Sequence, residues 1–165
     1  MKYILSFCFL FFWLVSECHP KSVRVKRVVD GDTFICAWNS TIHTCRITNI
    51  DAPELNQHFG AQSYQQLCNL LYGKKIILDS LGIDKYKRVL VFVSLGGRRL
   101  DSLLVRQGYA WHYVNYSKDP VLAAAMTRAQ VKFLGLWSCG IEHVCPPWLY
   151  RSYNFRNRWR YCNGC

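Results

Sequence analysis

Carboxylate side chains occur at two turns of this chain, with a spacing suited to binding a divalent cation. Asp30 and Asp32 flank a glycine, and Asp51 and Glu54 flank a rigid Ala-Pro pair. An Asp-Gly pair alone is typical of an ordinary solvent-exposed turn, so the second acidic turn carries most of the weight. Because Ca²⁺ prefers carboxylate, carbonyl and water oxygens, we predict a calcium site formed by Asp32, Asp51 and the backbone carbonyl of Ala52.

Positive charge lies close to these acidic turns. Arg46 lies in a predicted strand that leads to Asp51. Residues 84–88, with the sequence Asp-Lys-Tyr-Lys-Arg, form a charged loop between two later predicted strands. This loop offers cations and one aromatic ring beside the predicted sheet.

The composition is that of a folded, basic domain. The chain has 165 residues, with 21 lysines and arginines against 10 aspartates and glutamates, and a formal net charge of +11. Hydrophobic residues make up 51% of it, which excludes a disordered polybasic tail. A chain of this length normally forms one domain and needs neither a metal nor a disulfide in order to fold.

The apolar pattern predicts five strands and three helices. Alternating valines predict a strand from residue 23 until Asp30-Gly31, and strands over 33–38 and 42–48 complete an antiparallel meander. Helical spacing predicts a helix over 59–72 and a short one over 100–107, and Asp119-Pro120 is typical of the start of a third, ended by Gly135. Further strands are predicted over 75–79 and 89–94. Strands that cluster early favour an all-β or α+β fold, a small Greek-key barrel, over alternating βαβ units.

The N-terminus predicts export. Met1-Lys2 precedes an apolar stretch over 3–15 that is too short to span a bilayer, which is typical of a signal peptide. We predict a signal peptide at 1–18, with cleavage after Cys18 or, as an alternative, after Ser16. An uncleaved anchor and an acylated Cys18 are weaker alternatives. The mature chain is expected to be secreted, or periplasmic in a Gram-negative source, without stable membrane insertion.

Seven of the nine cysteines lie after residue 18. In an oxidising compartment they favour disulfides over metal binding, although an odd number leaves one unpaired or shared between chains. Cross-strand pairing of Cys36 with Cys45, pairing of Cys139 with Cys145, and pairing within the C-terminal residues are all candidates. A zinc site that uses the Cys162-Asn-Gly-Cys165 spacing is the weaker alternative, because no second such pair accompanies it.

Beyond Trp137 the periodic pattern ends. The last residues are rich in proline, aromatic residues and arginine, so we predict a domain over 19–148 and an extended, basic, cysteine-containing tail over 149–165. The tail is interpreted as a nonspecific grip on polyanions or as a solubilising extension.

Short motifs spread along the chain, in order, resemble the staphylococcal nuclease-like, or thermonuclease, family. They are VDGDT (29–33), RITN (46–49), IDAPE (50–54), DKYKR (84–88), LVRQG (104–108), YSKDP (116–120) and GLW (135–137). The resemblance implies an OB-type five-stranded Greek-key barrel with three helices. It also implies a calcium-dependent phosphodiesterase that cleaves DNA and RNA with little sequence preference and leaves 3′-phosphate ends.

The resemblance assigns roles by position. Asp32, Asp51 and the Ala52 carbonyl match the calcium ligands, and Glu54 matches the acid that orients or deprotonates the attacking water. Arg46 and Arg88 match the phosphate-binding arginines, a role that suits the planar guanidinium because it can hold two phosphate oxygens at once. The positions that contact the nucleotide are matched by Lys85, Tyr86 and Tyr116, with Tyr113 as a weaker candidate. Rings and cations together fit single strands.

One departure from the family concerns the arginine loop. Lys87 stands where many members have glycine. A positive φ there would strain the loop and re-aim Arg88; alternatively, the added charge of the lysine would tighten phosphate binding.

The leading hypothesis is a secreted, monomeric nuclease. The alternatives are an OB-fold module that binds nucleic acid without cutting it, and a cysteine-rich secreted interaction protein. The complete set of acids and arginines favours the enzyme.

Overall fold

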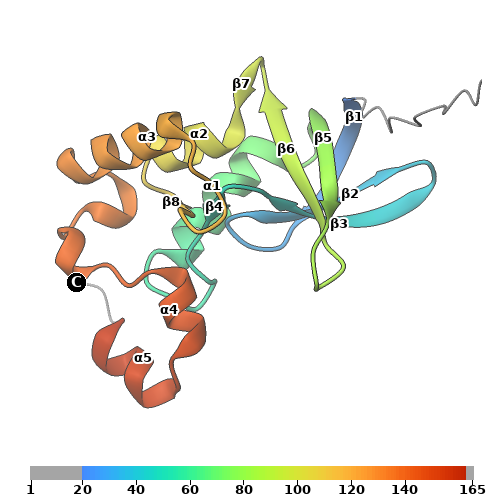
Figure 1. Ribbon diagram of the computed structural model, residues 1–165. Helices are drawn as coiled ribbons and strands as arrows, with labels where there is room; N and C mark the ends of the chain where they lie inside the picture. The colour runs from blue at the N-terminus through green and yellow to red at the C-terminus, as the bar shows by residue number, and fades with distance from the viewer. Residues whose placement is uncertain (1–19, 163–165) are drawn as a thin grey trace, which may run out of the picture.

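Five strands close into a barrel in the computed structural model, which describes residues 20–162 (Figure 1). They are β1 (Lys21–Val28), β2 (Thr33–Trp38), β3 (Thr41–Ile47), β5 (Lys75–Ile83) and β6 (Val89–Leu95). Neighbours in the order β3-β2-β1-β5-β6 are antiparallel, and β3 pairs in parallel with β6 to close the barrel. The expected OB-type five-stranded barrel is confirmed. The predicted signal peptide at 1–18 lies outside the described residues.

The valines of β1 face the core, as their spacing predicts. Val23, Val25 and Val28 are at most 3% exposed. The step of three between Val25 and Val28 breaks strict alternation, and it coincides with a register shift against β2 between Val25 and Arg27. Such a bulge turns the strand so that both halves of it keep an apolar side chain in the core.

The three predicted helices are present as α1 (Gly60–Leu71), α2 (Leu100–Arg106) and α3 (Pro120–Val131). Asp119 caps α3, since its side chain accepts a 2.8 Å hydrogen bond from the backbone nitrogen of Val121, and Pro120 follows at the start of the helix. In Figure 1, α2 and α3 lie together on one side of the barrel. Among residues 20–162, no helix is long and apolar enough to cross a membrane.

Three short strands complete the sheet structure. β4 (Ile50–Asp51) pairs antiparallel with β8 (Trp111–His112), so the second acidic turn is tied to the chain between α2 and α3. β7 (Arg98–Arg99) pairs with the end of β6. The backbone around Asp51 is therefore held on two sides, by the end of the barrel and by β8.

The C-terminal segment is not extended, contrary to the prediction. Two 3₁₀ turns, η1 (Gly135–Trp137) and η2 (Ile141–His143), lead to α4 (Pro147–Ser152) and α5 (Phe155–Tyr161), which lie at the lower end of the molecule in Figure 1. Asn154 caps α5 by accepting a 2.9 Å hydrogen bond from the backbone nitrogen of Asn157. Helices this short show too little of the 3.6-residue period to be recognised in a sequence. The domain boundary after residue 148 falls within α4 and stays a prediction.

The cysteine pairing differs from two of the candidates. Cys145 forms a disulfide with Cys162, not with Cys139. Cys139 is also disulfide-bonded. Cys36 and Cys45 are buried and reduced, with their sulfur atoms 3.5 Å apart, because the register of β2 and β3 sets them diagonally rather than opposite each other.

Candidate active site

The turn between β1 and β2 carries the first acidic pair. Asp30 accepts a 3.0 Å hydrogen bond from the backbone nitrogen of Asp32, and Asp32 accepts a 2.9 Å bond from the hydroxyl of Thr33. A Cβ atom on Gly31 would lie 2.7 Å from the Cβ of Ala52 and 2.8 Å from that of Ser63. Glycine is therefore needed here for close packing, so that the acidic turn can lie against the second turn and α1.

The second acidic turn meets the first through a buried arginine. The Arg46 guanidinium, on β3, ion-pairs with Asp32 and is 2.8 Å from Asp51 Oδ1. Asp51 is fully buried, Asp32 is 5% exposed and Arg46 is 9% exposed. Arg46 is placed by the β2–β3 ladder, in which it pairs with Thr33, the neighbour of Asp32. The cluster thus combines the ends of two adjacent strands with the turn that follows them.

Burial disfavours the charged forms of the carboxylates in this cluster when no cation is bound. Burial, together with the charge of Asp32, raises the pKa of Asp30 to about 7. Burial also raises the pKa of Asp51, and hydrogen bonds from Arg151 and the charges of Arg46 and Arg151 oppose that rise. Desolvated carboxylates that crowd together disfavour their charged forms unless positive charge is supplied.

The donor set fits a hard divalent cation. Among residues 20–162, no group of three or more His, Cys, Asp or Glu side chains is placed to hold a metal ion. A cation at Asp32 and Asp51 would therefore also need a backbone carbonyl, such as that of Ala52, and water. Calcium accepts such mixed oxygen ligands, whereas a structural zinc site normally uses four side chains.

Glu54 lies at the rim of the same turn. Its backbone nitrogen donates a 3.1 Å hydrogen bond to the side chain of Gln57, and its side chain is 34% exposed. The carboxylate is therefore anchored through its backbone while it stays accessible to water, as a general base must be.

The loop between β5 and β6 presents Arg88. Asp84 accepts hydrogen bonds of 2.9 Å from the backbone nitrogens of Tyr86 and Arg88, and one of 2.8 Å from the Arg88 side chain. Partial burial opposes these bonds, but their sum lowers the pKa of Asp84. The guanidinium of Arg88 also lies 5.3 Å from the Tyr86 ring centre. Asp84 therefore organises the whole loop around Arg88.

The strain expected at Lys87 is present, because its φ angle is 64°. This left-handed conformation favours glycine, and a lysine tolerates it at a cost. The turn is nonetheless closed: the Lys87 nitrogen bonds the Asp84 carbonyl and the Asp84 nitrogen bonds the Arg88 carbonyl, each over 2.9 Å.

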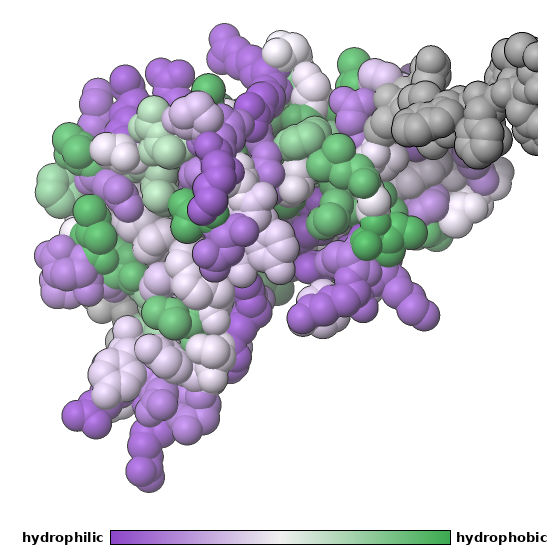
Figure 2. Space-filling model, in the orientation of Figure 1, coloured by the Kyte–Doolittle hydropathy of each residue, from purple (hydrophilic) through white to green (hydrophobic). Residues whose placement is uncertain are grey.

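One cleft with a volume of about 860 Å³ collects every predicted site residue. The predicted site residues among those that line it are Asp32, Arg46, Asp51, Ala52, Glu54, Lys85, Tyr86, Arg88 and Tyr116. In Figure 2, hydrophilic side chains cover the β5–β6 loop and α5, which project on either side of a hollow in the surface. The cleft is lined by the β5–β6 loop and by α4, which are far apart in the sequence.

Sequence reasoning missed two residues of this cleft. Trp148, which the sequence motifs did not single out, lines it and stacks on Tyr113 with ring centres 5.4 Å apart and planes 15° apart. Arg151, assigned to the tail, binds Asp51 and Glu54 directly. The arginine-rich composition of the last residues was the only signal, and it could not say which arginine reaches the cleft.

Comparisons with known proteins agree with this architecture. Residues 44–139 match the family described as staphylococcal nuclease homologue. An uncharacterized endonuclease of Haemophilus influenzae is 38% identical over 141 residues, which cover 83% of this chain and 79% of that protein. An uncharacterized endonuclease of Escherichia coli is 36% identical over 91% of this chain and 97% of its own length. A micrococcal nuclease of Shigella flexneri is 32% identical, covering 78% of this chain and 79% of that protein.

The barrel and these matches define a hydrolase of the nuclease type. The chain belongs to the staphylococcal nuclease-like family.

Proposed function

We propose that this nuclease is secreted, depends on calcium, and hydrolyses DNA and RNA with low sequence specificity to products with 3′-phosphate ends. The observation that carries the proposal is the convergence of two acidic turns and two arginines in one open cleft. The same cleft supports a preference for single strands, and we expect the enzyme to act as a monomer.

Asp32, Asp51 and the carbonyl of Ala52 are the proposed calcium ligands. The ligand oxygens belong to turns that are already joined, since Ala52 donates a 2.7 Å backbone hydrogen bond to Asp32. When bound, the cation neutralises the negative charge that develops on the phosphoryl oxygens during attack. Its presence would also remove the repulsion among the buried carboxylates.

Glu54 is the proposed general base or water-orienting group. Its side chain is 34% exposed and lines the same cleft as Asp51, so water can reach the carboxylate beside the proposed calcium site. Proton transfer of this kind contributes about 10²- to 10⁴-fold in typical enzymes.

Arg46 and Arg88 are the proposed phosphate clamps. They line the cleft from different elements, β3 and the β5–β6 loop, so one phosphate between them could be held from two sides. Charge-assisted hydrogen bonds from a guanidinium are strong, and the guanidinium stays charged at any working pH.

Lys85, Tyr86 and Tyr116 are the proposed contacts to the nucleotide. The Tyr86 and Tyr116 side chains are 67% and 78% exposed. Exposed rings offer faces on which unpaired bases stack without regard to sequence, which supports low specificity and a preference for single strands.

The decisive experiment is hydrolysis of single-stranded DNA and RNA by residues 19–165 in calcium, in magnesium and in chelator. Glu54→Gln and Arg88→Ala should each lower kcat/KM in calcium by at least about 100-fold. Glu142→Gln and Arg98→Ala are matched controls, because both residues are exposed and lie outside the cleft lining. Mass spectrometry of the products should find 3′-phosphate ends.

Cutting that survives in chelator would contradict the calcium requirement. No cutting in any metal, with DNA binding that is sensitive to salt and unchanged in Glu54→Gln, would leave the non-cutting OB-fold module as the function.

A further inference from the structure

An arginine from the C-terminal helix α4 reaches the two acids of the second turn. Arg151 Nη2 is 2.7 Å from Asp51 Oδ2, and Nη1 is 3.1 Å from Asp51 Oδ1 and 2.8 Å from Glu54 Oε1. One guanidinium therefore bridges a proposed calcium ligand and the proposed base. Asp51 and Arg151 are 100 residues apart in the sequence.

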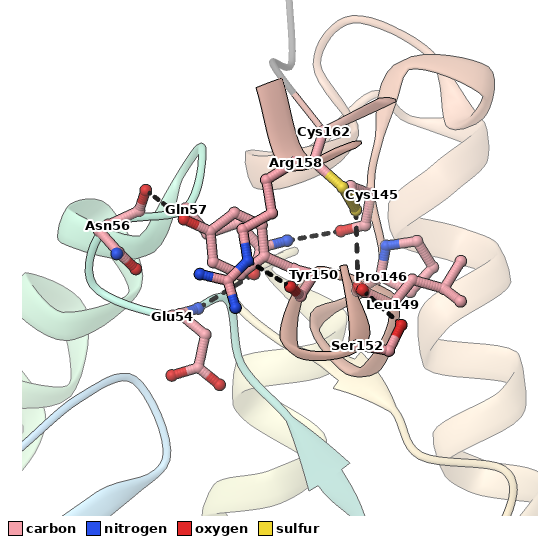
Figure 3. Close-up of a disulfide and its surroundings, with 10 residues drawn as sticks. All are labelled: Glu54, Asn56, Gln57, Cys145, Pro146, Leu149, Tyr150, Ser152, Arg158 and Cys162. Carbon is pink, nitrogen blue, oxygen red and sulfur yellow. Dashed lines mark hydrogen bonds between the residues drawn. A yellow bond between two sulfur atoms is a disulfide. The ribbon is translucent and has the colours of Figure 1, made fainter. Parts of the chain in front are cut away.

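The helix that carries Arg151 is fastened to the loop that carries Glu54 (Figure 3). The hydroxyl of Tyr150, the neighbour of Arg151, donates a 3.0 Å hydrogen bond to the carbonyl of Asn56. Gln57 donates a 2.6 Å bond to the carbonyl of Cys145, and the disulfide to Cys162 joins the start of α4 to the end of α5. The backbone of Arg151 is thus held beside the cleft whatever its side chain contacts.

The contact uses the oxygens that a cation would need. Asp51 Oδ1 accepts bonds from both Arg46, at 2.8 Å, and Arg151, and Asp51 Oδ2 accepts from Arg151. Calcium coordinates carboxylate oxygens directly at about 2.3–2.6 Å. A divalent ion at that distance competes with Arg151 for these lone pairs and repels the guanidinium, so binding of the ion opposes the Arg151 contact.

The burial of Asp51 explains why a substitute cation is useful. Its side chain is fully buried, whereas that of Arg151 is 43% exposed. A buried carboxylate that loses its partner is strongly destabilising, while an exposed arginine can swing into water at little cost. The exchange therefore favours movement of Arg151 and leaves Asp51 in place.

We propose that Arg151 is a positioning residue that holds Asp51 and Glu54 when no cation is bound and gives up Asp51 when calcium binds. This inference rests on the proposed calcium site. By linkage, whatever free energy the Arg151–Asp51 pair contributes to the metal-free protein reduces the apparent affinity for calcium.

The test compares the wild type with Arg151 variants, all of which keep Glu54. Calorimetry measures calcium binding, and thermal unfolding in chelator and in saturating calcium measures the Tm. Arg151→Ala should bind calcium at least about fivefold more tightly than the wild type. In chelator its Tm should fall by several degrees, and in saturating calcium the difference should shrink. Arg151→Lys keeps the positive charge but loses the bidentate contact. Its calcium affinity and its Tm in chelator should lie between those of the wild type and Arg151→Ala.

Two controls separate a direct contact from a general effect of charge. Lys85→Ala removes a positive charge from the same cleft and should leave the Tm in chelator unchanged. Arg156→Ala removes an exposed arginine from α5 and should change neither measurement.

The inference is overturned if Arg151→Ala gains no more calcium affinity than Lys85→Ala, or if its loss of Tm is equal in calcium and in chelator. If Arg151→Ala gives either of these results while the wild type cuts DNA in calcium, only the role of Arg151 is refuted. A wild type that neither binds calcium nor cuts refutes the proposed function as well.

Discussion

Asp32 Oδ2 accepts a 2.7 Å hydrogen bond from the backbone nitrogen of Ala52, twenty residues further along the chain. Through this bond the turn after β1 and the turn after β4 hold each other, and the proposed calcium ligands become one rigid unit. The bond can form only because the first turn approaches the second closely, at Gly31.

Gly31→Ala should therefore disturb both turns. The new methyl group would lie 2.7 Å from the Ala52 Cβ and 2.8 Å from the Ser63 Cβ. We expect the free energy of unfolding to fall by about 1–3 kcal/mol, as in other overpacked sites, and activity to fall with it. Chemical denaturation and a nuclease assay measure the two effects. The double variant with Ala52→Gly removes one of the clashes and should recover part of the stability; no recovery would contradict the explanation by close packing.

Lys87→Gly should stabilise the arginine loop. Lys87 has a φ of 64°, and replacing it with glycine removes a backbone strain worth up to about 1 kcal/mol. Urea unfolding should show a modest rise in stability. Lys85→Gly is the matched control, because Lys85 is not among the residues with positive φ, and it should be neutral or destabilising. If both substitutions lower the free energy of unfolding equally, the positive φ of Lys87 does not destabilise the protein and the prediction is wrong.

Trp148→Ala should weaken binding of single-stranded substrates. Trp148 stacks on Tyr113, and the Tyr113 and Tyr116 rings are 4.8 Å apart, so its loss removes support from the aromatic side of the cleft. We expect KM to rise by up to about tenfold, since stacking contributes about 1–3 kcal/mol per base. Trp148→Phe should retain most of the affinity. Trp159→Ala changes an exposed tryptophan on α5 that does not line the cleft, and an equal effect there would refute a role for the stack.

Removal of the disulfide should lower stability. Cys145 and Cys162 are 17 residues apart, and closing a loop of this size contributes about 3 kcal/mol in the chain-entropy model. The double variant Cys145→Ser, Cys162→Ser should lose about this much in denaturant unfolding. Cys68→Ser, at a free cysteine of α1, serves as the control and should change stability by less than about 1 kcal/mol.

Acid should weaken the fold partly through His112. Its side chain belongs to a residue only 2% exposed, and burial lowers its pKa. The unfolded chain then takes up a proton near pH 6.5 while the folded one resists, so stability is full above about pH 6.5 and falls as the pH drops through the lowered folded pKa. The loss of unfolding free energy between pH 7 and pH 5 should be smaller in His112→Gln. His58→Gln, at an exposed histidine, should keep the slope of the wild type.

Local patterns in the sequence determined most of the elements. β2 has the predicted bounds, Thr33–Trp38, and α3 begins at the predicted Asp119-Pro120 cap, because side-chain alternation and capping act within a few residues. The residue types of the site could also be predicted from the sequence, because binding of cations and phosphates calls for carboxylates and guanidiniums wherever these lie in the chain.

Only the tertiary structure decided which distant residues meet. The Cys145–Cys162 disulfide, the stack of Trp148 on Tyr113 and the reach of Arg151 to Asp51 all depend on how α4 packs against the rest of the chain. A six-residue helix has too few local interactions for its position to be predicted from the sequence. Its place is set by contacts such as that of Tyr150 with Asn56, 94 residues away, and the free energy of such contacts depends on the whole packed chain.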